Sequence, residues 1–145
     1  MQNQISSNYS NNLLFVLSIL ECIEKLTIYS EGFDSSEHFF ESDDQQAYNA
    51  SCHLLLAIGE ETKKIDSSLK DEISFIEWNQ ITSLRNRIAH DYRGIDPDIV
   101  FSILKNELGI LKLALNQLLK IIQPDQILLE QYVNTKYFKH LSYLL

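Results

Sequence analysis

One apolar stripe in the C-terminal half of the chain constrains the fold more than any other feature. Its members recur at alternating steps of four and three residues, which predicts a long helix packed nearly antiparallel to others in a bundle. An expected helix start at Asp96-Pro97-Asp98 precedes the stripe, and Pro124-Asp125 ends it. Gly109 lies inside this helix, where a glycine costs about 1 kcal/mol relative to alanine. The stripe comprises Leu104, Leu108, Leu111, Leu115, Leu118 and Ile122.

The composition supports the same fold class. Only four glycines and two prolines occur among 145 residues, so the chain has few turns and its elements must be few and long. A hydrophobic content of 45% is enough to build a core. We therefore expect an all-α protein, with residues 1–145 forming one domain built as an antiparallel bundle of four to five helices.

Periodicity and capping residues predict the remaining helices. Ser35–Ser42 and Ser67–Ser74 read as connections, and the segment 124–145 reads as an extra C-terminal helix whose aromatic residues pack on the protein rather than stack on bases. The first expected helix runs from about Leu13 to Tyr29, after caps at Ser10-Asn11-Asn12. The second runs from about Gln45 to Lys64, after caps at Asp43 and Asp44, and its inward residues are Tyr48, Cys52, Leu55 and Gly59. The third begins at a capping box at Ser74–Glu77, and its inward residues are Trp78, Ile81, Leu84 and Ile88.

Charge and cysteine usage narrow the function. A net charge of -8 argues against nonspecific coating of nucleic acid, so an RNA contact would need a local basic site. Met1 to Asn12 is polar and does not resemble a secretion signal, and the apolar run Leu13 to Leu20 is too short to span a membrane, so we expect a cytoplasmic protein. Cys22 and Cys52 lie in apolar surroundings typical of buried, reduced thiols, and no residues show the spacing of a metal site.

The only obvious basic site lies between Leu84 and Gly94. All three arginines of the chain fall in this stretch, together with one of its four histidines. On an ideal helix Arg85 and Tyr92 share a face and Asn86 lies one turn below His90, whereas Arg85 and His90 are splayed by about 140°. Either the helix ends near His90, or a second copy of the helix completes the site. The residues concerned are Arg85, Asn86, Arg87, His90, Tyr92 and Arg93.

These side chains suit the cleavage of an RNA phosphodiester bond. Arginine binds phosphate oxygens through a planar, permanently charged fork, and histidine exchanges a proton near neutral pH. Cleavage needs a base for the 2′-hydroxyl, a cation for the charge on phosphorus and an acid for the leaving oxygen. Asn86 could orient the imidazole of His90.

The pattern Arg85-Asn86-Arg87-Ile88-Ala89-His90-Asp91-Tyr92 resembles the HEPN superfamily, and within it the HepT toxin family. Ile58-Gly59-Glu60, Trp78 and Gly94-Ile95-Asp96 extend the resemblance over about Leu13 to Leu119, whereas the tail after Pro124 departs from it. The resemblance implies a homodimeric, metal-independent endoribonuclease that needs no cofactor, cuts tRNA or mRNA rather than DNA, and belongs to a type VII toxin–antitoxin system.

The same resemblance assigns roles to the motif. His90 would be the acid/base residue, Arg85 the phosphate clamp and Asn86 the orienting residue, with Arg87 and Arg93 contacting RNA. A cognate minimal nucleotidyltransferase, the antitoxin, would transfer AMP from ATP-Mg to Tyr92. The nucleotide would then satisfy Arg85 and obstruct the cleft.

Two alternatives stay open at this stage. The chain could be a non-catalytic HEPN helper subunit that binds a nucleotidyltransferase partner, a role that its net acidity suits. It could also be a bundle whose charged residues cluster by chance on a solvated helix face, which would leave the grouping of all three arginines unexplained.

Overall fold

The predicted apolar stripe lies at the centre of a helical bundle in a computed structural model, which describes residues 2–145, with side chains from residue 11 onward. This part of the chain contains helices and turns and no strand, so the predicted all-α class is confirmed. The helices are α1 (Gln2–Ser30), α2 (Ser36–Glu41), α3 (Gln46–Lys64), α4 (Ser67–Asp71), α5 (Trp78–His90), α6 (Pro97–Asn106), α7 (Leu108–Ile122) and α8 (Gln126–Val133).

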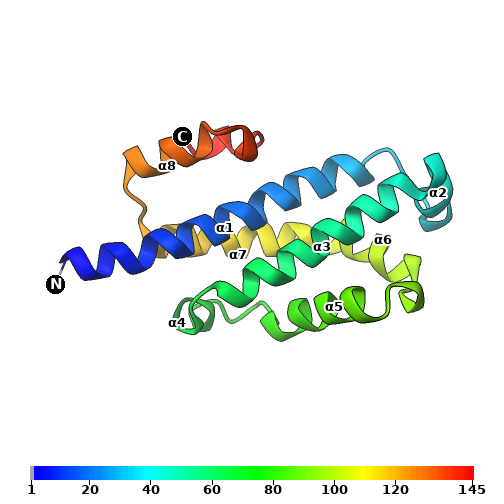
Figure 1. Cartoon of the computed structure of the whole chain (residues 1–145), viewed down its shortest axis with the longest axis horizontal. Coiled ribbons are helices and arrows are strands. Elements are labelled where there is room, and N and C mark those ends of the chain that lie inside the picture. The colour runs from blue at the N-terminus through cyan, green and yellow to red at the C-terminus, as the bar shows by residue number, and fades with distance from the viewer. Residues whose placement is uncertain (1) are drawn as a thin grey trace.

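Three long helices form the core, and the motif helix lies outside them. α1 packs against both α3 and α7, and α5 packs against the outer side of α3 (Figure 1). The faces that meet are apolar at the predicted spacing, since Leu17, Leu20, Leu115 and Leu118 are wholly buried. Among residues 2–145, no helix combines the length and the apolar character needed to cross a membrane.

The long helix predicted after Asp96 is in fact two helices. The start is as expected, because the Asp96 carboxylate accepts a hydrogen bond of 2.9 Å from the Asp98 amide. The helix then breaks at Glu107, between α6 and α7. Asn106 and Gly109 flank the break and are both poor helix formers, which weakens the helix there. All six residues of the stripe are nevertheless buried.

Several predicted caps are wrong because other contacts fix the helix ends. Residues 10–12 lie inside α1 and do not begin it, and the side chain of Ser10 lies outside the described part. The Asn12 side-chain amide donates to the carboxylate of Asp66, just before α4, and its side-chain oxygen accepts from the Asp66 backbone amide. Asp43 and Asp44 are in a left-handed turn (φ 48° and 56°) rather than at the start of α3. α5 begins at Trp78 without the predicted capping box, and the Trp78 indole donates to the Lys70 carbonyl at 3.0 Å.

The segments on either side of the core also differ from expectation. Ser35–Ser42 contains a short helix, α2, whose Phe39 is fully buried. In the tail, α8 ends at Val133 and two short 3-10 helices follow, Lys136–Phe138 and Ser142–Leu144. A continuous helix is excluded because the chain turns back onto α1, where the ring of His140 pairs with Glu21 at 2.6 Å and Leu141 is buried.

Candidate functional site

The motif helix ends within the motif. α5 stops at His90, and the chain turns through Asp91 into the short 3-10 segment Tyr92–Gly94. Arg85 and Tyr92 therefore do not share the face of one straight helix, as their spacing would otherwise require. Of the predicted inner stripe, Ile88 is buried, whereas Trp78, Ile81 and Leu84 are half-buried.

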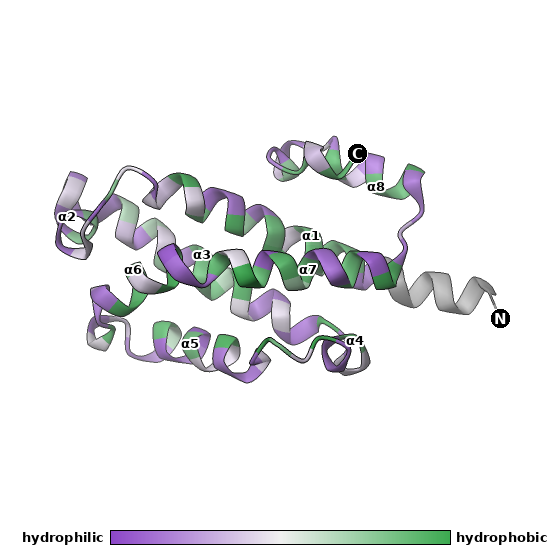
Figure 2. Cartoon of the chain, turned by 180° about the vertical axis from the view of Figure 1, so that it is seen from behind, coloured by the Kyte–Doolittle hydropathy of each residue, from purple (hydrophilic) through white to green (hydrophobic). Residues whose placement is uncertain are grey.

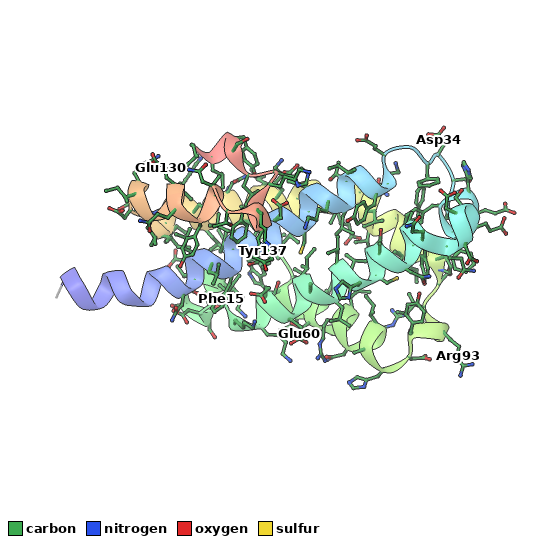
Figure 3. All side chains as sticks on the ribbon, turned by 45° about the horizontal axis from the view of Figure 1, so that its top comes forward. Phe15, Asp34, Glu60, Arg93, Glu130 and Tyr137 are labelled. Carbon is green, nitrogen blue, oxygen red and sulfur yellow. The ribbon has the colours of Figure 1, made fainter. Side chains whose placement is uncertain are left out.

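Arg85 is held from two sides. Its Nε forms an ion pair with the carboxylate of Glu60 on α3, and its Nη1 donates a hydrogen bond of 3.0 Å to the side-chain oxygen of Asn86. The Arg85 side chain is 23% exposed. These two contacts restrain the guanidinium, whose Nε is excluded from solvent while part of the side chain stays exposed. Figure 3 labels Glu60 on α3, on the side where α5 lies.

A glycine on α3 allows this approach. Gly59 is buried, and a Cβ placed on it would collide with the Arg85 Cβ and lie 2.7 Å from its Cγ. The aliphatic part of Arg85 thus packs directly on the α3 backbone. A larger residue at position 59 would push α5 or the arginine away.

Tyr92 is held by the other end of α3. Its hydroxyl donates to the side-chain oxygen of Asn49, and its ring lies 6.3 Å from that of Tyr48, centroid to centroid. The side chain is still 42% exposed. Burial, with a smaller contribution from the neighbouring Cys52, raises the pKa of Tyr92 above its usual value. The hydroxyl therefore stays protonated at neutral pH and would need a base to become a nucleophile.

The other polar residues of the motif point outward. His90, Arg87 and Arg93 are exposed, and Arg93 extends away from the bundle in Figure 3. The described side chains include no hydrogen-bond partner for His90, and Asn86 contacts Arg85 rather than the imidazole. A single chain thus joins Arg85 with Asn86 but leaves His90 apart from them.

An apolar groove runs beside the motif helix. It has a volume of about 820 Å³ and separates α5 from α6 and α7. Seen from behind, α7 lies in front, with hydrophobic segments interrupted by hydrophilic ones, and α5 runs below it (Figure 2). Apolar side chains from all three helices line the groove, and Arg87 stands on its α5 wall. The apolar lining includes Ile81, Leu84, Ile99, Ile103 and Ile110.

The sequence does not assign a contact in the site to Asn49 or Glu60, although Glu60 belongs to the Ile58-Gly59-Glu60 stretch that extends the family resemblance. Asn49 and Glu60 both lie on α3, far from the motif in the chain, and only the packing of α3 against α5 brings them to Tyr92 and Arg85. The predicted burial of Gly59 was the available signal, because a buried glycine in a helix indicates a close neighbour. Among the side chains of residues 11–145, no three His, Cys, Asp or Glu side chains gather as a metal ion would require.

Comparison with known proteins identifies the family. Residues 19–118 match the family described as "Ribonuclease HepT-like", so this chain belongs to the HepT-like ribonuclease family. The matched range contains the motif and both α3 residues that hold it. The tail after Pro124 lies outside it.

Three curated relatives come from Methanocaldococcus jannaschii. "Putative RNase MJ1380" is 24% identical over 98 residues, covering 68% of this chain and 87% of the relative. "Putative RNase MJ1216" is 23% identical over 109 residues, or 75% and 88% of the two chains, and "Putative RNase MJ0125" is 22% identical over 109 residues, or 75% and 91%. No solved structure matches the chain.

The contact at Gly59 yields a test of stability. Replacing a helical glycine by alanine normally stabilises a helix by about 0.5–1 kcal/mol. We expect Gly59→Ala instead to destabilise the protein by about 1–3 kcal/mol, because the new methyl group collides with Arg85. Gly109→Ala is the matched control, since a Cβ there meets nothing within 4 Å, and it should be neutral or stabilising. Urea denaturation measures both, and a stabilised Gly59→Ala would contradict the packing described.

Proposed function

We propose that this protein is an endoribonuclease that cleaves RNA, tRNA or mRNA, without a metal and that acts as the toxin of a type VII toxin–antitoxin system. The observation that carries the proposal is a fixed guanidinium and an exposed, unpaired imidazole on one helix. Membership of a family of HepT-like ribonucleases supports the reaction class. An RNA substrate and an ATP-using partner would place this activity in the cytoplasm.

The residues divide the chemistry between them. Arg85 stabilises the negative charge that develops on the phosphorus-bound oxygens, and Asn86 holds the guanidinium by its Nη1. His90 takes the proton of the 2′-hydroxyl, which attacks the phosphorus, or returns a proton to the leaving 5′-oxygen. Arg87 and Arg93, both exposed, would add contacts to the RNA backbone.

Removing either central residue tests the proposal. Arg85→Ala and His90→Ala should each reduce RNA cleavage by at least about 100-fold, because each removes a group that acts in the transition state. The measurement is cleavage of total RNA by purified protein, together with growth of cells expressing each variant. His38→Gln is a control at another exposed histidine and should cleave like the wild type. Full activity of either alanine variant would contradict the assignment, and a wild type that binds its partner but cleaves nothing would favour the helper-subunit alternative.

A homodimer would complete the site. α5 lies on only one side of the core and leaves an apolar groove between itself and α6–α7. Ile110 in this groove is 50% exposed, and Leu113 beside it on α7 is 55% exposed, which is unfavourable in water. In a two-fold dimer the same surface serves both copies, so covering the groove would bring two α5 helices together. Two copies of His90 could then supply the base and the acid.

An aspartate in the groove should separate the copies. We expect Ile110→Asp to shift the protein to monomers and to lower cleavage in parallel, because burying a carboxylate in an apolar interface is costly. Ile127→Asp is the matched control, because Ile127 is 66% exposed on α8, away from the groove. Analytical ultracentrifugation gives the oligomeric state and an RNA assay gives the activity. A monomeric wild type with full activity would exclude a shared site.

Tyr92 would be the regulatory residue. A cognate minimal nucleotidyltransferase using ATP-Mg would join the Tyr92 oxygen to the α-phosphorus of ATP and release pyrophosphate. The side chain of Tyr92 is accessible to such a partner, and Asn49 fixes the direction of the Tyr92 hydroxyl. A tyrosine hydroxyl is protonated at neutral pH and the raised pKa of Tyr92 favours that form, so the partner would supply the base that removes the phenolic proton.

Mass spectrometry tests this modification. Co-expression with a cognate minimal nucleotidyltransferase should add one or more adenylyl units to the wild type and none to Tyr92→Phe. Tyr137→Phe is the control, because Tyr137 is 72% exposed and would be the preferred target if accessibility alone decided. An unmodified Tyr92 in the presence of active partner and ATP would rule out this mode of regulation.

A further inference from the structure

We propose that Glu60 is a positioning residue for Arg85: its carboxylate holds the Nε edge of the guanidinium so that the opposite edge faces the RNA phosphate. This inference rests on the proposed ribonuclease function and assigns a role to a residue of α3 that lies outside the motif. It starts from the ion pair between the two side chains across the α3–α5 contact.

The contacts of the Arg85 guanidinium support this role. A guanidinium has five N–H donors. The Glu60 carboxylate forms an ion pair with Nε, an atom that is excluded from solvent, and the Asn86 side-chain oxygen accepts a hydrogen bond from one N–H of Nη1. The three remaining donors are on the terminal nitrogens. A phosphate that approaches the exposed edge can therefore receive two parallel hydrogen bonds.

The packing at Gly59 restricts the rotational freedom of the Arg85 side chain. Its Cβ and Cγ touch the α3 backbone, so only the outer part of the side chain can still rotate. Glu60, the next residue on α3, then sets that last rotation. Three neighbouring groups, Gly59, Glu60 and Asn86, thus determine where the charge points.

The negative charge of Glu60 allows a role in orienting Arg85 to be distinguished from a role in binding RNA. A carboxylate next to Arg85 repels RNA, and the chain already carries a net charge of -8. Removing it should therefore leave RNA binding unchanged or tighter. Loss of orientation should nevertheless slow the reaction, because a misplaced group can cost about 100-fold in rate. The two effects have opposite signs and are measured separately as KM and kcat.

We expect Glu60→Gln to lower kcat by about 10- to 100-fold without raising KM. Glu61→Gln is the matched control: it removes the same charge from the adjacent position of α3, where the carboxylate pairs with Lys64 at 2.8 Å. In an Arg85→Ala background, Glu60→Gln should cause no further loss, since its effect passes through Arg85. An unchanged or increased kcat of Glu60→Gln, or an equal loss in Glu61→Gln, would overturn the proposal.

A second readout does not depend on cleavage. The chain has only three arginines, so nitrogen-15 NMR gives three Nε–H signals that single lysine substitutions can assign. The Arg85 signal should exchange slowly with water in the wild type and in Glu61→Gln, and faster in Glu60→Gln. Exchange of the wild-type Arg85 signal as fast as that of the exposed Arg93 would overturn the pairing. Slow exchange in a wild type that cleaves no RNA would instead overturn the proposed function while leaving the pairing in place.

Discussion

The close contact between α3 and α5 is the interaction on which the site depends. At Gly59 the α3 backbone touches the aliphatic part of Arg85, and this places the guanidinium within reach of Glu60. At the other end of the same helix, Asn49 holds the Tyr92 hydroxyl. α3 therefore acts as the support, while α5 carries Arg85 and the 3-10 segment after it carries Tyr92. A site built on two packed helices is more precise than one built on loops.

The sequence predicted the parts of the structure that follow from periodicity. The all-α class, the buried leucine stripe of α6–α7 and the inward face of α3 with Tyr48, Cys52 and Leu55 agree with the structure. Helix ends were less predictable, because partners distant in the chain fix them. Trp78, for example, is held by the carbonyl of Lys70, and the tail leaves the helical path to place Leu141 on the core.

For the candidate site, too, some features were predictable from the sequence and others depended on contacts between distant parts of the chain. Its composition was visible because the three arginines cluster, but its geometry was not. The spacing indicated that Asn86 would reach His90, whereas it bonds Arg85. The contacts of Asn49 and Glu60 with the motif could be found only through the packing of α3. The predicted angular separation of Arg85 and His90 does persist: the former packs on α3 and the latter is exposed at the end of α5. This is the geometry that a second copy across the apolar groove would resolve.

The two attachment points on α3 also constrain how a nucleotide on Tyr92 could silence the protein. Asn49 and Glu60 are eleven residues apart, or about 16 Å along a helix that rises about 1.5 Å per residue. The phosphate of an AMP group is bonded directly to the tyrosine oxygen, so within one chain it would lie well away from Arg85. Neutralising the guanidinium of the same chain is therefore disfavoured as the mechanism. Silencing would then act by obstructing the approach of RNA, or by contact with the Arg85 of a second copy, and the second route requires the dimer.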